Sequence, residues 1–311
     1  DSHGSGSMGE SWRRHHRALA EFILKYESKN IFEIGGGHGT LAREYIGKRT
    51  NATWTILEAN PTPNYNHDRI SFQKGIFDDS CVINNDIDTI VHSHLFEHIY
   101  SPVSFIKKLY DSLPNGGYTI FSVPFLEQQI KENITYCLGF EHTIFLNETF
   151  IEFFLHQAGF KIIDKQIYQE NHSLFYCAQK KGDSCIDVSF PNKYDEYLEL
   201  FKNYFQFNEN KVADLNRLIK SSSEKVFLFG GHVASQYLIS YGLNIECLES
   251  ILDNDPKKQG RRLYGTNLKV RSPQVLRNMG KVNVILRQGV FNKEIKEDIL
   301  EQINNNVVFW E

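Results

Sequence analysis

Long apolar runs, paired cysteines and basic runs are all missing from the sequence. No stretch approaches the ~20 consecutive apolar residues of a membrane-spanning helix, so we expect no membrane partner. The five cysteines are scattered without a Cys-x-x-Cys pair, which is typical of reduced thiols in a cytoplasmic protein. The formal net charge is −4 and no basic run occurs, which argues against nucleic acid as a partner.

The length of 311 residues is enough for two domains, each with a core of its own. Residues 1–7, which precede Met8, are interpreted as an expression remnant and are left out of the fold prediction. We expect a first domain at 8–182, a helical connector at 183–222 and a smaller second domain at 223–311.

A glycine-rich turn organises the first domain. The apolar run at 31–34 predicts a buried strand, and the residues from Thr40 onward predict a helix. Glycine is needed where the backbone takes a positive φ or where a ligand approaches closely, and a helix start offers free N–H groups. The pattern therefore predicts a nucleotide-type binding loop, with a purely structural turn as the alternative. Four glycines stand between the strand and the helix: Gly35, Gly36, Gly37 and Gly39.

Two acidic residues restrict the ligand of this loop. The glycine spacing differs from that of a phosphate-binding P-loop. Glu33, inside the first strand, argues against a pyrophosphate and favours a cationic or amine-bearing ligand. The next predicted strand, 53–58, ends in Glu58, about 20 residues downstream, at the place where an acid binds a ribose diol.

Strands and helices continue to alternate in both halves, which predicts α/β domains with mainly parallel sheets. In the first half, five more strands are expected, the last two as an antiparallel hairpin, at 69–74, 87–94, 118–124, 161–168 and 173–179. In the second half, strands are expected at 226–229, 249–256 and 282–286. The connector predicts two helices, one with apolar residues from 194 to 205 and one around 212–219.

Taken together, these residues resemble a known site. Glu33-Ile34-Gly35-Gly36-Gly37-His38-Gly39, followed by Leu57-Glu58, is similar to the S-adenosylmethionine site of class I methyltransferases, and the resemblance continues to about residue 182. It implies a Rossmann-like sheet of seven strands, S-adenosylmethionine as cofactor and S-adenosylhomocysteine as product. The implied cofactor-binding residues are Glu33, Gly35, Gly36, Gly37, Gly39, Glu58, Ala59, Phe77, Asp78, Ser93 and His94.

Histidines near the predicted fourth strand raise the possibility of a metal site. His92, His94 and His98 lie close together in sequence, but the segment 93–98 resembles the end of that strand in methyltransferases that need no metal. We therefore expect no metal, with His94 beside the cofactor or the substrate entrance. His15 and His16, in a predicted helix at 11–25, are interpreted as solvated.

The candidate catalytic residue is His142, which follows the predicted fifth strand. An imidazole titrates near neutral pH, as the removal of a proton from an acceptor requires. Glu141 precedes it and is expected to orient it. The alternative is that His142 packs or contacts substrate without base chemistry.

The second half has a resemblance of its own. The segment 253–261, with Gly265-Thr266 and Ser272-Pro273, is similar to the carboxy-terminal domain of sugar C-methyltransferases, which act on nucleotide-linked keto-deoxysugars. That family also carries an amino-terminal zinc module with clustered cysteines, which this sequence is expected to lack. Methylation of carbon, oxygen or nitrogen therefore stays open. The substrate-binding candidates are His98, Gly230, Gly231, Lys258 and Arg261.

The sequence thus predicts an S-adenosylmethionine-dependent methyltransferase with a small-molecule acceptor. The expected acceptor is a nucleotide-linked sugar, in surface-polysaccharide or modified-sugar biosynthesis. One rival is a methyltransferase-like protein that binds the cofactor without turnover. The other is a nicotinamide-dependent oxidoreductase, which the missing Gly-x-Gly-x-x-Gly spacing and Glu33 both disfavour. The sequence does not indicate an oligomeric state.

Overall fold

The computed structural model describes residues 10–63, 66–83, 86–135, 137–139, 141–182 and 189–311. The predicted expression remnant at 1–7 lies outside the described residues. The chain divides into two compact units. The first is built from residues up to 128 and from 140 to 192, and the second from 129–139 and from 193 to the end.

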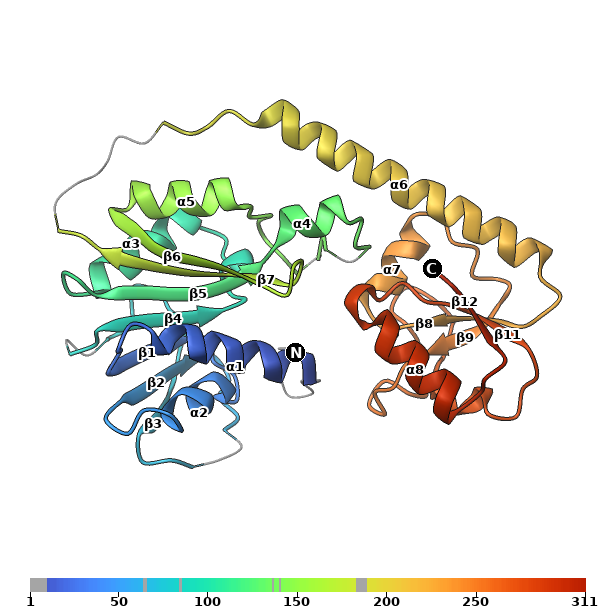
Figure 1. Cartoon of the computed structure of the whole chain (residues 1–311), viewed down its shortest axis with the longest axis horizontal. Helices are drawn as coiled ribbons and strands as arrows, with labels where there is room; N and C mark the ends of the chain where they lie inside the picture. Colours follow the sequence, from blue (N-terminus) through green and yellow to red (C-terminus); the bar gives the residue numbers. More distant parts are fainter. Residues whose placement is uncertain (1–9, 64–65, 84–85, 136, 140, 183–188) are drawn as a thin grey trace. The chain divides into compact units, whose positions relative to one another are not determined.

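The first unit contains a seven-stranded sheet with the order β3-β2-β1-β4-β5-β7-β6 (Figure 1). All neighbouring strands are parallel except β7, which runs antiparallel to both β5 and β6. The predicted sheet and its closing antiparallel hairpin are confirmed. The strands are β1 (Asn30–Ile34), β2 (Thr53–Glu58), β3 (Ile70–Lys74), β4 (Thr89–Ser93), β5 (Tyr118–Pro124), β6 (Phe160–Tyr168) and β7 (Ser173–Lys180).

Helices cover both faces of this sheet because successive strand residues point to opposite sides. Ile31 packs with α1 (Glu10–Leu24) and α2 (Thr40–Ile46) in one core cluster. Phe32 packs with α3 (Pro102–Ser112) and α5 (Glu148–Gln157) in the other. The short helices η1 (Phe96–His98) and α4 (Leu126–Lys131) follow β4 and β5.

Helix α1 corrects one expectation about its histidines. His15, interpreted from sequence as solvated, is fully buried, and His16 is half-buried. The His15 ring lies 5.3 Å from the ring of Phe175 in β7 and 5.3 Å from that of Tyr168. The reason is that the apolar stripe of α1 continues across this position onto β7, which the sequence of the helix alone does not reveal.

The second unit contains a parallel sheet of five strands in the order β10-β9-β8-β11-β12. The smaller Rossmann-like domain predicted from sequence is thereby confirmed. Its strands are β8 (Val226–Phe229), β9 (Leu248–Leu252), β10 (Val270–Arg271), β11 (Val282–Ile285) and β12 (Val307–Trp310). Its helical segments are α6 (Tyr194–Ser221), α7 (Val233–Ser240), η2 (Pro273–Leu276), η3 (Gly289–Phe291) and α8 (Asn292–Gln302).

Helix α6 is one continuous helix of 28 residues, where the sequence predicted two. Val212, Leu215 and Ile219 on its carboxy-terminal half join the core of the second sheet. Near its middle, the Tyr204 hydroxyl donates to the carbonyl oxygens of Ile134 and Thr135, each at 3.1 Å. These bonds explain why the segment 129–139 belongs to the second unit.

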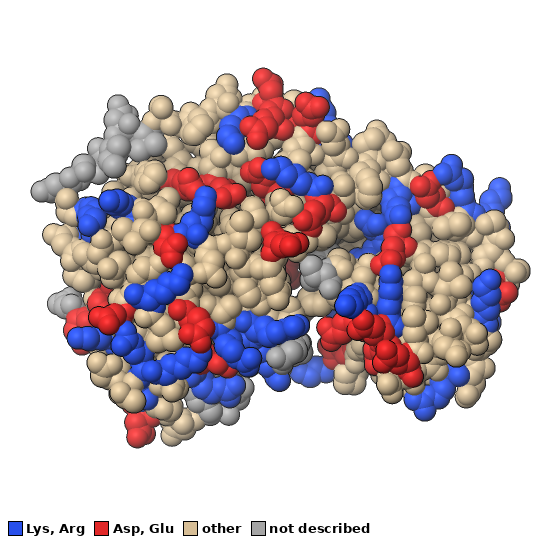
Figure 2. Space-filling view, in the orientation of Figure 1, with Lys and Arg blue, Asp and Glu red and all other residues tan. Residues whose placement is uncertain are grey.

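The distribution of charged side chains (Figure 2) and the hydropathy of the helices agree with what the sequence predicted. On the face shown in Figure 2, Lys and Arg side chains are interspersed with Asp and Glu. Within the described parts of the chain, none of the helices is both long and apolar enough to cross a membrane.

Candidate functional site

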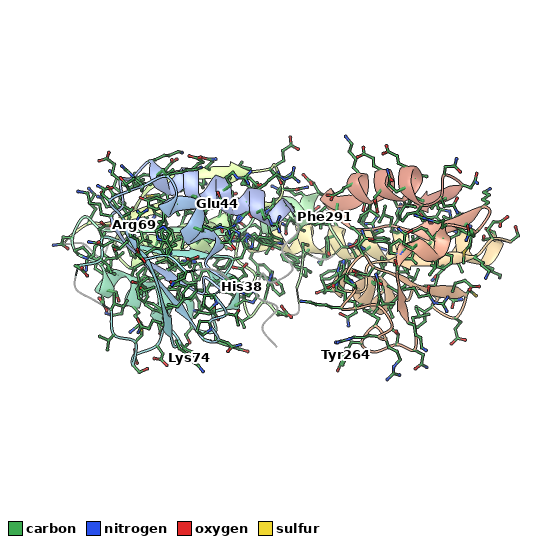
Figure 3. All side chains as sticks on the ribbon, turned by 90° about the horizontal axis from the view of Figure 1, so that it is seen from below. His38, Glu44, Arg69, Lys74, Tyr264 and Phe291 are labelled. Atoms are coloured by element: carbon green, nitrogen blue, oxygen red, sulfur yellow. The ribbon has the colours of Figure 1, made fainter. Side chains whose placement is uncertain are left out.

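The glycine loop lies where the strand order reverses, between β1 and β4, which is the usual ligand position of an open α/β sheet. Gly37 takes a left-handed φ of 55°, and Gly35 is anchored by its N–H to the Leu57 carbonyl at 2.8 Å. His38, labelled in Figure 3, contacts the loop after β2 through the Thr62 carbonyl, 2.6 Å from its Nδ1. The loop is thus tied to the end of β2 on both sides.

Glu58, the last residue of β2, holds this loop from the neighbouring strand. Its Oε2 accepts a hydrogen bond from the Gly37 N–H at 3.0 Å, and its Oε1 accepts one from the Asn60 N–H at 3.2 Å. The side chain is half-buried, and Ala59 beside it is exposed. Because a carboxylate has about four lone-pair sites, Glu58 can still accept from a vicinal diol.

Glu33 lies beneath the loop and is only 2% exposed. Its Oε2 accepts a hydrogen bond from the Trp54 indole at 2.8 Å. Burial raises the pKa of this carboxyl to about 8, although the Trp54 bond opposes the shift. A Cβ atom at Gly36 would lie 2.6 Å from the Glu33 carboxyl carbon, so only glycine fits above it. The sequence predicted Glu33 as a ligand-binding residue. In the structure its buried side chain packs under the backbone of Gly36 and binds Trp54.

The loop after β3 contains Phe77 and Asp78, the two residues predicted to contact adenine, and their side chains have different surroundings. The Phe77 ring packs against Phe105 of α3, with centroids 5.7 Å apart. The Asp78 carboxylate is exposed and accepts from the N–H and hydroxyl of Ser80, and these bonds lower its pKa. Ile76, which was not among the predicted residues, is 68% exposed in the same loop.

The end of β4 brings the predicted residues Ser93 and His94 beside the loop. The Ser93 and Ser122 hydroxyls lie 2.9 Å apart. His94 has a left-handed φ of 47°, which is uncommon for a residue other than glycine and is frequent at functional sites. Its Nδ1 lies 3.2 Å from Glu97 Oε1, and its Nε2 lies 2.8 Å from the Ser173 hydroxyl.

The segment with His142 is fastened to η1. The N–H groups of Thr143 and Ile144 donate to the Glu97 carbonyl at 2.9 and 3.3 Å, and His98 Nδ1 lies 3.0 Å from the Glu141 carbonyl. The rings of His98 and His142 meet edge-on with centroids 5.1 Å apart. Two backbone hydrogen bonds, one contact from the His98 side chain to the backbone and one ring contact therefore position the candidate base.

Glu97 brings a carboxylate close to His142, in addition to Glu141, which the sequence predicted to orient this histidine. Ligand atoms of Glu97, His98 and His142 all lie within 4.8 Å of one another. Glu141 is exposed and contributes its backbone carbonyl to His98. The sequence signal for Glu97 was its position three residues after His94 and directly before His98, on one turn of helix.

Burial and neighbouring charges change the pKa values of His142 and Glu97. Burial lowers the pKa of His142, against the opposing charge of Glu97. Burial alone would raise the pKa of Glu97, but the hydrogen bond and charge of His94, with the charge of His98, hold it below its usual value. At neutral pH the site therefore holds an ionised Glu97 beside a neutral His142.

In the second unit, the predicted substrate residues gather at the carboxyl end of β8. The Gly231 N–H donates to Asp253 Oδ2 at 2.7 Å, and Lys258 Nζ contacts the same oxygen at 3.0 Å. Gly230 directly precedes this contact and takes a left-handed φ of 107°. The Arg261 side chain is exposed.

His92, His94 and His98, which raised the possibility of a metal site, do not together form a group with metal-ligating geometry among the described residues. His92 is fully buried and stacks on Phe121 with ring centroids 4.7 Å apart, while His94 contacts Glu97 and Ser173. Among the described residues, two other groups have metal-ligating geometry. They are His15, His94 and His172, and Glu97, His98 and His142.

Family comparisons divide the chain in the same way as the fold. A family model described as a methyltransferase domain matches residues 10–165. A second, described as a C-methyltransferase C-terminal domain, matches residues 191–309. A comparison with curated proteins finds no match.

Solved structures of similar fold share little sequence with this chain. Human N-acetylserotonin methyltransferase in complex with S-adenosylmethionine is 17% identical, with 55% of this chain and 53% of that chain covered and a TM-score of 0.45. The chain thus spans about half the length of the human enzyme. An O-methyltransferase family protein from Burkholderia thailandensis is 13% identical, with 55% and 57% covered and a TM-score of 0.42. An S-adenosylmethionine-dependent methyltransferase from Mesorhizobium loti is 12% identical, with 52% and 96% covered and a TM-score of 0.43.

Proposed function

Since the chain belongs to the class I S-adenosylmethionine-dependent methyltransferases, we propose that it methylates a nucleotide-linked sugar, with His142 as the general base. The observation that supports cofactor binding best is the contact between Gly37 and Glu58. It presents a carboxylate beside a glycine loop at the strand-order reversal, where a ribose diol binds. The loop glycines, with Ser93 and His94, then surround the methionine end.

The chemistry is a direct displacement at the methyl carbon. The acceptor atom forms a bond to the methyl group while the bond from sulfur to that carbon breaks, and its electron pair leaves neutral S-adenosylhomocysteine. His142 takes the acceptor proton, from a carbon beside a ketone or from a hydroxyl, before or during transfer. The protein supplies mainly alignment of the two reactants in a dry site.

Two features of the second unit support the proposed acceptor, one for its methylated atom and one for its phosphate. The match of residues 191–309 to a C-methyltransferase C-terminal domain favours carbon as the methylated atom. The Lys258 ammonium, which contacts Asp253 and has three hydrogens to donate, can also contact a phosphate. Acceptor identity rests on these residues of the second unit.

Calorimetric titration of the full chain tests the cofactor half of this proposal. We expect S-adenosylmethionine and S-adenosylhomocysteine to bind and NAD not to bind. Glu58→Ala is expected to weaken both adenosyl ligands by about 10- to 100-fold, because hydrogen bonds to a charged group are worth roughly 1.5–3 kcal/mol. Glu44→Ala, in α2 beside Arg17 of α1, is the matched control and should bind normally.

Other outcomes would favour one of the two alternative functions, an oxidoreductase or a binding protein without turnover. Binding of NAD in place of the adenosyl ligands would contradict the proposal in favour of an oxidoreductase. Normal adenosyl binding without methyl transfer to any member of a nucleotide-sugar panel would favour a binding protein without turnover. Methylation of a hydroxyl in that panel would correct the acceptor atom alone.

The pH dependence of turnover tests His142 as the base. Because burial lowers its pKa from 6.5, the imidazole stays neutral and able to accept a proton as the pH falls through 6.5. We expect the acid limb of kcat/KM for the acceptor, measured at saturating cofactor, to lie below pH 6.5. A limb at or above 6.5 would speak against His142.

A further inference from the structure

Three histidines far apart in the sequence meet beside the end of β4. His15 lies in α1, His94 follows β4, and His172 directly precedes β7. One ligand nitrogen of each lies within 4.8 Å of the other two. We propose that His15, His94 and His172 bind a divalent transition metal ion such as Zn²⁺ or Co²⁺. This inference goes beyond the proposed function and does not rest on it, and it departs from the sequence expectation of a metal-free protein.

Among these three histidines, His15 is the one whose ring nitrogens are both buried without a hydrogen bond. Its whole side chain is fully buried. A buried polar group without a partner is costly, and such groups are rare in native proteins. Since the ring lies 5.2 Å from that of His94 and 5.3 Å from that of His172, an ion shared by the three would satisfy it.

His94 is held as metal-ligating histidines usually are. Glu97 Oε1 lies 3.2 Å from Nδ1, on the side of the ring away from the Nε2 contact with Ser173. A carboxylate at the second nitrogen fixes the orientation of the ring and makes the first nitrogen a better ligand. His94 has a left-handed backbone conformation at the end of β4, and its side chain reaches Ser173, the first residue of β7.

The Ser173 hydroxyl lies between two of the proposed ligands, His94 and His172. It is 2.8 Å from His94 Nε2 and 2.6 Å from His172 Nδ1. Bonds of 2.0–2.1 Å in a tetrahedral site place ligand nitrogens about 3.4 Å apart, so the rings need to close by about 1.4 Å at most. The hydroxyl moves aside by a single side-chain rotation or becomes the fourth ligand.

The chemistry of the three ligands selects the kind of ion. Burial lowers the pKa of His15 and, to about 4, that of His172, so both rings are neutral and offer lone pairs at neutral pH. Imidazole nitrogens suit zinc, cobalt, nickel and copper, whereas magnesium and calcium require oxygen ligands. The Trp12 ring packs 4.9 Å from His94 and 5.3 Å from His172, which shields the group from water.

The neighbouring group of Glu97, His98 and His142 is the rival position for an ion. There His98 Nδ1 already contacts the Glu141 carbonyl, and Glu97 already faces His94. No ring in that group has both nitrogens buried and unpartnered, as His15 has. The three histidines are therefore the preferred site, with Glu97 as their outer support.

The proposed ion would join three elements that are otherwise far apart in the chain. It would fasten α1 and the β6–β7 connection to the end of β4, next to Ser93 at the predicted cofactor site. Metal loading is therefore expected to stabilise the first unit as well as to bind.

The experiment uses the full chain, stripped of metal with a chelator and desalted. Zn²⁺ is titrated by calorimetry, and Co²⁺ is followed by its visible ligand-field absorption. We expect one ion per chain and a raised Tm. His172→Gln and His15→Gln are each expected to weaken binding by about 100-fold or more, since loss of even an outer partner costs 10–100-fold. Circular dichroism checks the fold of His15→Gln, and His172→Gln serves if that variant does not fold.

The matched control is His16→Gln. His16 neighbours His15 on the same helix, with ring centroids 5.3 Å apart, but lies outside the group of three. It should keep full affinity. Absence of stoichiometric binding, or equal loss in His16→Gln and His172→Gln, would overturn the proposal. So would binding that survives in His172→Gln and disappears in His98→Gln, which would place the ion in the neighbouring group.

Discussion

Replacing His142 by alanine is expected to lower kcat by about 10²- to 10⁴-fold while leaving the affinity for S-adenosylmethionine unchanged. The imidazole is kept neutral by burial and lies beside Glu97 and His98, whereas Glu58 accepts its hydrogen bonds from Gly37 and Asn60. Its loss should therefore remove proton transfer without disturbing cofactor contacts. Single-turnover kinetics with a responsive acceptor and calorimetry with the cofactor measure the two quantities separately.

A matched variant separates base chemistry from a general effect of losing a histidine. His156→Ala, at the end of α5, removes an imidazole from the same unit outside the site and should leave kcat unchanged. Normal turnover in His142→Ala would remove the base assignment but leave the cofactor site intact. Equal loss of turnover and of cofactor affinity would instead assign His142 to the fold of the site.

Replacing Gly36 by alanine is expected to reduce cofactor affinity at least tenfold and to destabilise the first unit. The new Cβ would lie 2.6 Å from the Glu33 carboxyl carbon and 2.7 Å from a methyl group of Ile56. Overpacking costs roughly 1–3 kcal/mol, and displacing Glu33 also breaks its bond to Trp54. We expect a Tm lower by roughly 5–10 °C in thermal unfolding, from a loss of about 2–4 kcal/mol.

Gly280→Ala is the control for this substitution. A Cβ at that exposed glycine meets no atom within 4 Å, and its φ lies outside the left-handed region. It should bind cofactor normally and unfold at the usual temperature. Normal affinity and stability in Gly36→Ala would contradict this prediction. They would show that the Glu33 side chain can move away without loss of stability and that the loop tolerates a side chain.

The parts of the site that the sequence predicted are local in the chain. The strand, the glycine turn and the helix start at 30–46 follow from hydrophobic pattern and glycine spacing, and these signals need only a dozen neighbouring residues. Glu58 was predictable because parallel strands of this type end at one edge of the sheet. Strand β5 was predicted with its observed bounds, since a proline-glycine turn precedes it and the apolar run ends in Pro124.

The parts that were missed depend on contacts between distant segments. His15 is buried because α1 packs against β7, which begins some 160 residues later in the chain. Phe77 and Ile76 are adjacent and both apolar, so only the presence of Phe105 decides which of them is covered. Glu97 and Glu141 are both acids next to a histidine, and burial alone distinguishes them.

Each unit has a contact between a carboxylate at the end of its second strand and a glycine N–H after its first strand, and the two contacts differ in local charge. At Gly37 the Glu58 carboxylate accepts backbone N–H groups and no cationic side chain contacts it in the described chain, whereas at Gly231 the Asp253 carboxylate is shared with the Lys258 ammonium. The Glu58 carboxylate thus keeps its negative charge facing the glycine loop, whereas the charge of Asp253 is compensated by Lys258. The same backbone contact therefore has a different electrostatic environment in each unit, and Lys258 makes the difference.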